Sequence, residues 1–203
     1  MIRVEKNNCL QKQCIPSLPS VNRLEKAMLT HATFKSSASV LDANVRTGGM
    51  AEYLLSRTDC QVCGISDRME EIRKIRTKLS NGDFAYAAIG DIPWQDASFD
   101  VVLLHPALGG LAALEEQLKE CSRVIRTGGQ LVLGLKTVPA FLIRAGRILE
   151  LPSMDGDGII GVDDAENALK SFGFIHITRH PVAFGGCVLI GQRREDEQKN
   201  RLE

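Results

Sequence analysis

The stretch Val40-Leu-Asp-Ala-Asn-Val-Arg-Thr-Gly-Gly-Met50 reads as the end of a buried strand, a loop, and the first residues of a helix. The apolar run stops at Asp42, and the Gly48-Gly49 pair marks the turn before the helix. In open α/β sheets, ligands bind at the carboxyl ends of the strands, where the strand order reverses. The loop after Asp42 is therefore the first place where a functional site is expected.

Strands and helices alternate on the carboxyl side of this stretch. Short apolar runs predict strands, and apolar residues at spacings of three and four predict helices. This alternation is typical of right-handed βαβ units, in which helices cover a parallel sheet. The predicted strands are 39–42, 61–65, 84–89, 99–104 and 130–135, and the predicted helices between them are 50–55, 67–79 and 111–125.

Further elements are predicted on both sides of this region. Ser20 is expected to cap a short helix over 21–30. Near the carboxyl end, two strands separated by only a few residues predict an antiparallel hairpin. The elements expected here are a helix over 138–149, a helix over 162–172, and strands over 174–179 and 186–192.

The chain has 203 residues, a length that suits one compact domain. We expect an α/β domain over 37–192, an N-terminal extension with a short helix over 1–36, and a charged tail over 193–203. Lys and Arg together number 25, as do Asp and Glu, so the formal net charge is zero. This balance argues against general binding to nucleic acids or anionic membranes, because such binding depends on a basic surplus.

No segment has the features of a membrane span or a signal peptide. The longest apolar region, 131–151, is interrupted by Lys136, Arg144 and Arg147. The N-terminal residues carry no apolar core of the kind that a signal peptide requires. A cytoplasmic location is therefore expected.

Cys60 and Cys63 have the spacing of half a zinc site or of a redox pair. A zinc site would require two further ligands. Cys63 falls in an apolar strand, where a cysteine packs as a small hydrophobic residue. We therefore expect no bound metal.

Four segments together resemble the class I S-adenosylmethionine-dependent methyltransferases, in particular their small-molecule, type 11-like branch. The first motif of that family is a strand followed by Asp-x-Gly-x-Gly-x-Gly and a helix. Asp42 matches the acid and Gly48 the last glycine, while Asn44 and Arg46 stand at the places of the first two glycines. The other three segments are Asp91-Ile-Pro-Trp with Ser98 to Leu104, Cys121 to Leu133, and Asn167 to Phe174.

The order and spacing of these segments over about residues 37–192 carry the resemblance. It implies a Rossmann-like, doubly wound, mostly parallel seven-stranded sheet, with helices on both faces and an antiparallel C-terminal hairpin. It also implies S-adenosylmethionine as the cofactor and methyl transfer to a small molecule.

Asn44 and Arg46 are the departures that bear most on the cofactor. Glycines in this loop allow positive φ angles and close approach of the backbone to a ligand. Asn44 is expected to adopt a left-handed conformation, because asparagine tolerates it better than other non-glycine residues. For Arg46 two alternatives stay open. Its side chain turns aside or pairs with the carboxylate of the cofactor, or it fills the space of the methionyl part.

The resemblance places the contact with the ribose at the end of the second strand, where the family has an acidic residue. Ser66 stands at that position and Asp67 follows it. Asp67 either takes over the contact with the ribose hydroxyls or stabilises the next helix through its dipole. Arg68 or Met69 is then expected to lie against the adenine.

Asp91 matches the acid that accepts a hydrogen bond from the adenine amino group in the family. The alternative is that it caps a turn before Pro93. Ala43, in the first loop, and Ile92, next to Asp91, complete the predicted contacts with the cofactor.

His105 ends the fourth strand, at the edge that faces the methyl group in the family. Methyl transfer is a displacement at carbon, so positioning supplies much of the rate. A base with a pKa near neutrality helps only where the acceptor must lose a proton, and His105 is the candidate for that role. The alternative is a strand-end histidine without a catalytic role. His176 and His180 are expected to be surface or edge residues.

Two functions are compatible with these patterns. The first is an active methyltransferase, and the second is a degenerate member of the family that binds a ligand or a protein without catalysis. Asn44, Arg46 and Ser66 favour the second. A nicotinamide dinucleotide enzyme is not expected, because the chain lacks Gly-x-Gly-x-x-Gly after the first strand.

The acceptor pocket of the family is built by segments that here are 1–36 and 137–161, and neither carries a motif that identifies a substrate. The apolar helix near Phe141 is expected to form either a lid or the surface of a homodimer.

Overall fold

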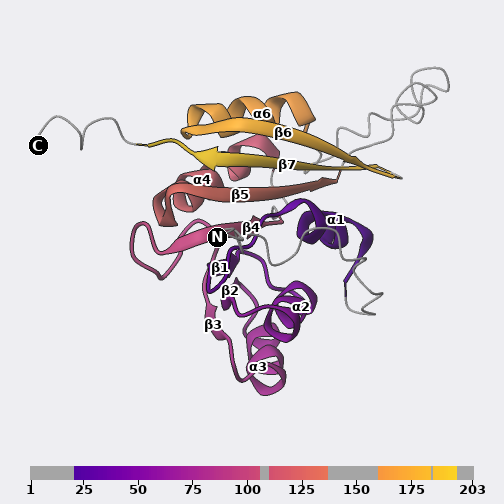
Figure 1. Cartoon of the computed structure of the whole chain (residues 1–203), viewed down its shortest axis with the longest axis vertical. Helices are drawn as coiled ribbons and strands as arrows, with labels where there is room; N and C mark the ends of the chain where they lie inside the picture. The colour runs from indigo at the N-terminus through magenta and orange to yellow at the C-terminus, as the bar shows by residue number, and fades with distance from the viewer. Residues whose placement is uncertain (1–20, 106–109, 137–159, 184, 196–203) are drawn as a thin grey trace, which may run out of the picture.

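The computed structural model describes residues 21–105, 110–136, 160–183 and 185–195, and within them seven strands form one sheet (Figure 1). The strand order is β3-β2-β1-β4-β5-β7-β6. The strands are β1 (Ser39–Asp42), β2 (Gln61–Ser66), β3 (Asp83–Tyr86), β4 (Phe99–Leu104), β5 (Ile125–Lys136), β6 (Phe174–Val182) and β7 (Gly186–Arg193).

Strands β1 to β5 run parallel to one another, and the last two strands are antiparallel to their neighbours. The order reverses between β1 and β4, which lie side by side in the centre of the sheet. This pair therefore forms the switch point at which an open α/β sheet binds ligands. The predicted mostly parallel seven-stranded sheet with a C-terminal hairpin is confirmed.

Helices cover both faces of the sheet. Leu24, Leu54 and Ile72 from three different helices pack in one buried apolar cluster, and Leu114 and Leu169 belong to a second cluster. The first cluster lies under α1, α2 and α3, and the second under α4 and α6. The helices are α1 (Arg23–His31), α2 (Gly49–Arg57), α3 (Met69–Lys78), α4 (Gly110–Val124) and α6 (Val162–Ser171).

Helix α1 begins later than predicted, and its cap is Asn22 rather than Ser20. The side-chain oxygen of Asn22 accepts hydrogen bonds from the backbone N–H groups of Leu24 and Glu25. The Glu25 carboxylate accepts in return from the backbone N–H of Asn22 at 2.8 Å. This reciprocal capping box satisfies the first free N–H groups of the helix, so the helix starts at Arg23.

Several other boundaries differ from the predictions, most clearly those of β3 and β5. Strand β3 ends at Tyr86, short of the predicted 89, and β5 begins at Ile125 instead of Gln130. The early start of β5 includes an irregular register, because Phe99 pairs with Ile125 whereas Val101 pairs with Gln130. The predicted helix over 138–149 lies outside the described residues.

Asp100, near the amino end of β4, has a structural role. Its carboxylate accepts a hydrogen bond from the backbone N–H of Ser39 at 2.8 Å and pairs with Arg126 at 2.9 Å. These contacts join the amino ends of β1, β4 and β5, away from the edge where ligands bind.

Candidate functional site

A cleft of about 230 Å³ opens at the carboxyl ends of β1 and β2. Its walls come from the loop after β1, the end of β2, the segment after β3, and one face of α4. The residues that line it are Ala43, Asn44, Ser66, Asp67, Ala88, Ile89, Gly90, Ala113, Glu116 and Gln117. Four of the predicted cofactor residues are thus brought together: Ala43, Asn44, Ser66 and Asp67.

Backbone hydrogen bonds hold the loop after β1 against the neighbouring strands. The N–H of Ala43 donates to the carbonyl of Leu103, and the N–H of Val45 donates to that of Ile65, each at 2.9 Å. Gly48 follows with a φ of 75° and caps α2. A Cβ at Gly48 would lie 3.3 Å from the side chain of Ile75, so both the backbone angle and the space favour glycine.

Asn44 joins the ends of β1 and β4. Its backbone N–H donates to the Asp42 carboxylate at 3.3 Å, and its side-chain amide donates to the backbone carbonyl of His105 at 3.1 Å. The left-handed conformation predicted for Asn44 is wrong, because the non-glycine residue of this loop with a positive φ, of 34°, is Arg46. The side-chain amide of Asn44 bridges the ends of two strands. The positive φ falls on Arg46, two residues later.

Arg46 is exposed and is not among the residues that line the cleft. Its charge nevertheless acts on the site, because it contributes to the lowered pKa of His105. Among the described residues, the arrangement agrees with a side chain that turns aside.

Asp42 lies beneath the loop, with 1% of its surface exposed. Burial raises the pKa of its carboxyl to about 7, the backbone N–H of Asn44 opposes this shift, and the charge of Glu25 adds to it. Asp42 therefore supports the loop through its hydrogen bond from the backbone N–H of Asn44. It does not line the cleft, whereas Ala43 and Asn44 do.

Ser66 stands at the end of β2 with its hydroxyl already engaged. The hydroxyl donates to the carboxylate of Glu71 at 2.7 Å and accepts from the backbone N–H of Arg68 at 3.1 Å. Asp67 is exposed at the rim of the cleft, and Met69, 42% exposed, begins α3 outside the lining. The helix predicted from 67 starts at Met69, and Asp67 and Arg68 connect it to the end of β2.

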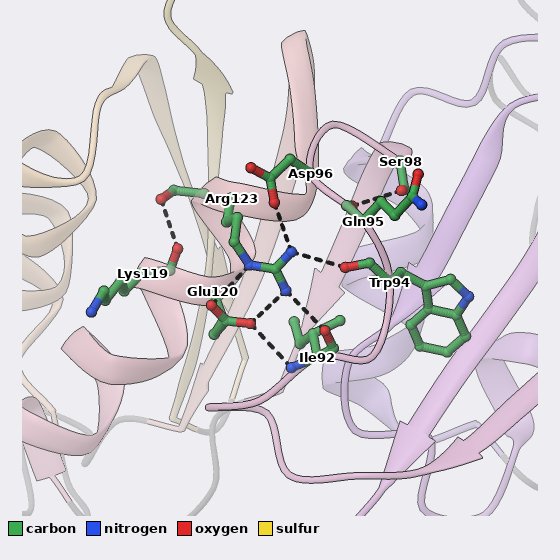
Figure 2. Close-up of polar contacts among 9 residues, drawn as sticks. Ile92, Trp94, Gln95, Asp96, Ser98, Lys119, Glu120 and Arg123 are labelled. Atoms are coloured by element: carbon green, nitrogen blue, oxygen red, sulfur yellow. Dashed lines mark hydrogen bonds and ion pairs between the residues drawn. The ribbon is translucent and has the colours of Figure 1, made fainter.

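The segment after β3 is fixed by an arginine of α4 (Figure 2). The guanidinium of Arg123 donates to the backbone carbonyls of Ile92 and Trp94, each at 2.8 Å. It also pairs with the carboxylates of Asp96 and Glu120. Glu120 in turn accepts from the backbone N–H of Ile92 at 3.1 Å.

This network bears on two predicted cofactor residues. Ile92 is buried and its N–H is used by Glu120, while Asp91 is exposed, and neither residue lines the cleft. The sequence did not single out Glu120 and Arg123. Their spacing of three on a predicted helix is the signal that could have indicated an ion pair.

His105 directly follows β4 with 5% of its surface exposed, and its Nε2 has no hydrogen-bond partner among the described residues. Burial, together with the smaller effects of the positive charges of Arg46 and Lys136, lowers its pKa to about 4. The imidazole is therefore neutral at pH 7. This pKa lies well below the near-neutral value that a general base would use.

Gln117 is a feature that the sequence did not single out. It lines the cleft from α4 with 6% of its surface exposed, and its Oε1 has no partner among the described residues. A signal was present, because Gln117 takes an apolar position in the series Leu114, Leu118 and Cys121. A polar residue in such a stripe indicates either a buried hydrogen bond or a ligand.

Three further observations concern the remaining predictions. In the part of the chain that the structure describes, no group of His, Cys, Asp and Glu is arranged to hold a metal ion. Cys63 is half-buried, and burial raises the pKa of its thiol to about 11. His180 stacks on His31 with ring centroids 4.0 Å apart, and His176 is exposed.

No helix within the described ranges is long and apolar enough to cross a membrane.

Comparison with known proteins gives a consistent result. Residues 41–133 match the family described as methyltransferase domain. The chain is 28% identical over 153 residues to 27-O-demethylrifamycin SV methyltransferase of Amycolatopsis mediterranei (strain S699), covering 70% of this chain and 55% of that protein. It is 33% identical over 96 residues to demethylmenaquinone methyltransferase of Tropheryma whipplei (strain Twist), covering 46% and 40% respectively. The chain spans about half the length of these curated relatives.

The fold also matches solved structures. A SAM-dependent methyltransferase from Methanosarcina mazei superposes with a TM-score of 0.64 at 17% identity, over 80% of this chain and 95% of that one. At this level of identity the similarity shows the fold alone.

Proposed function

Because the chain belongs to the class I S-adenosylmethionine-dependent methyltransferase family, we propose that it binds S-adenosylmethionine in the cleft and transfers the methyl group to a small molecule. The observation that carries the proposal is the position of the cleft. It opens at the carboxyl ends of β1 and β2, next to the switch point between β1 and β4, and its lining includes Asn44, Ser66 and Asp67 from two of the predicted cofactor segments.

The polar character of the cleft suits this cofactor. Asp67 and Glu116 contribute carboxylates, and no Lys or Arg is among its lining residues. Such a surface favours a ligand that carries hydroxyl and amino donors or a positive charge, and it disfavours a phosphate. S-adenosylmethionine carries ribose hydroxyls, two amino groups and a sulfonium.

The size of the cleft indicates which part of the cofactor it holds. Its volume of about 230 Å³ is below the range of roughly 300–1,000 Å³ for complete small-molecule sites. We therefore assign it to the nucleoside part. Asp67 would accept from the ribose hydroxyls, in place of the acid that the family has at Ser66.

The remaining site residues would act on the other end of the cofactor. When bound, S-adenosylmethionine supplies a methyl group activated by attachment to a sulfonium. The exposed guanidinium of Arg46 would pair with its carboxylate. Neutral His105 would orient the acceptor through a hydrogen bond to Nε2, since its pKa of about 4 makes it a weak base.

The alternative function, ligand or protein binding without catalysis, loses one of its supports. It was favoured partly by a side chain of Arg46 that fills the cleft, and Arg46 is outside the lining. Asn44 is likewise accommodated, because it bridges two strands through its amide.

Thermal unfolding with S-adenosylmethionine and with S-adenosylhomocysteine tests the proposal. Ligand at a hundred times its dissociation constant is expected to add about 2.7 kcal/mol to the free energy of unfolding. For a chain of this length that raises Tm by roughly 5–10 °C. No shift with either compound at millimolar concentration would contradict the proposal.

A further inference from the structure

The side chain of Gln117 is buried at the cleft without a partner for its oxygen. It is 6% exposed, and its Oε1 has no hydrogen-bond partner among the described residues. Buried amide oxygens in native proteins are nearly always satisfied, because leaving one without a donor is costly. An oxygen that borders a cleft and lacks a donor indicates that a ligand supplies it.

The local structure of α4 presents this side chain to the cleft. Ala113, Glu116 and Gln117 are spaced by three and four, so they share one face of the helix, and all three line the cleft. Ala113, four residues before Gln117, carries only a methyl group, which is the smallest of the three side chains. Glu116 is exposed, and Gln117 lies deeper.

Asp91 and Ile92, two of the residues that the family resemblance assigned to the cofactor, do not line the cleft. The backbone N–H of Ile92 donates to Glu120, and Asp91 is exposed and outside the lining. At the end of β2, the hydroxyl of Ser66 already donates to Glu71. Gln117 is thus the buried side chain at the cleft whose acceptor is still unused among the described residues.

We propose that Gln117 recognises the base of the cofactor, with Oε1 accepting a hydrogen bond from the exocyclic amino group of adenine. The side-chain amide also carries an N–H₂ donor, which would face a ring nitrogen of the same edge. This is the pairing by which glutamine and asparagine recognise adenine elsewhere. The inference rests on the proposed function, and it makes Gln117 a specificity-determining residue of the site.

Calorimetry on the full chain tests this assignment with two ligands. One is S-adenosylhomocysteine, and the other is its purine analogue, in which a hydrogen replaces the amino group. The wild type is expected to bind the adenine compound about tenfold more tightly, because the analogue leaves Oε1 unsatisfied. Gln117→Met, which has the same length and no acceptor oxygen, is expected to bind the two ligands with affinities within about twofold of each other.

Gln95→Met is the matched control, because Gln95 is exposed on a loop outside the cleft, and it should keep the preference of the wild type. Removing a buried oxygen that lacks a partner should not lower Tm in the absence of ligand. If Gln117→Met nevertheless fails to fold, Gln117→Leu is measured in the same way.

The outcomes separate this inference from the proposed function. A wild type that binds both ligands equally, or a folded Gln117 variant that keeps the preference for adenine, overturns the role of Gln117 and leaves cofactor binding in place. A wild type that binds neither ligand at millimolar concentration overturns both.

Discussion

The side-chain amide of Asn44 donates a hydrogen bond to the backbone carbonyl of His105 at 3.1 Å. This contact joins the carboxyl ends of β1 and β4 at the point where the strand order reverses. It explains how a residue that replaces a glycine is accommodated in the loop. The amide of Asn44 thus links the loop after β1 to the residue that follows β4.

Replacing Asn44 by alanine should weaken this junction. We expect Asn44→Ala to lower the free energy of unfolding by about 1–2 kcal/mol, because it removes one hydrogen bond to a buried strand end. Urea unfolding measures the change. Asn81→Ala, at an exposed position, is the control and should leave stability within about 0.5 kcal/mol of the wild type. Equal stabilities for the two variants would contradict the role given to Asn44.

Arg46 combines a positive φ with an exposed charge, so its replacement by glycine should have two opposite effects. Arg46→Gly should raise stability by up to about 1 kcal/mol, because glycine adopts a φ of 34° without strain. It should weaken binding of S-adenosylhomocysteine about tenfold, because the ion pair with the ligand carboxylate is lost.

Arg46→Lys separates these two effects, since it keeps a positive charge on a long side chain and does not introduce a glycine. It should bind more tightly than Arg46→Gly and gain no stability. Tighter binding by Arg46→Gly than by the wild type would show instead that the side chain obstructs the ligand.

Asp42 should give the stability of the fold a measurable pH dependence. Its folded pKa of about 7 lies above the unfolded value of about 3.9. The proton on Asp42 therefore stabilises the native state, and this contribution is complete below the unfolded pKa and is lost as the pH rises through 7. Relative to Asp42→Asn, the wild type should become progressively less stable between about pH 4 and 7. Parallel stability profiles for the two proteins over this range, measured by urea unfolding, would contradict the burial of a titrating carboxyl.

Arg123 should be required for the stable conformation of the segment after β3. Arg123→Gln removes hydrogen bonds to the carbonyls of Ile92 and Trp94 and the ion pairs with two carboxylates. We expect a loss of about 2–3 kcal/mol and faster hydrogen exchange at the backbone N–H of Ile92.

Two comparison variants sharpen this prediction. Arg123→Lys should recover only part of the loss, because an ammonium cannot reproduce the fork of the guanidinium. Arg73→Gln, at an exposed position of α3, should have little effect. An unchanged exchange rate at Ile92 in Arg123→Gln would argue against the network as the support of this segment.

The strands of the sheet could be predicted from the sequence because each is marked by a short apolar run of neighbouring residues. The apolar runs at 39–42, 61–65 and 99–104 each correspond to a strand, and the short linker before 186 corresponds to the hairpin. The start of α1 was missed, because the decision between Ser20 and Asn22 depends on the reciprocal contact with Glu25. The early start of β5 was missed as well, because Ile125 pairs with a strand that is distant in sequence.

The candidate site could be predicted only in part, and for a similar reason. Asn44 and Ser66 follow the carboxyl ends of predicted strands, so the topology places both at the cleft. The backbone angle was assigned to Asn44 instead of Arg46, because residue preference alone does not reveal the hydrogen bond to His105. Gln117 faces the cleft from a helix, and its unsatisfied oxygen becomes evident only when the surrounding residues are in place.

Closing the cleft with a large side chain is the most direct test of the central claim, that this cleft holds the nucleoside of S-adenosylmethionine. Ala113 lines the cleft, whereas its neighbour Ala112 is exposed on α4 outside it. Titration calorimetry with S-adenosylhomocysteine should detect one site in the wild type and in Ala112→Trp, and at least about a hundredfold weaker binding in Ala113→Trp. No binding by the wild type, or equal affinity in Ala113→Trp and Ala112→Trp, would contradict the account.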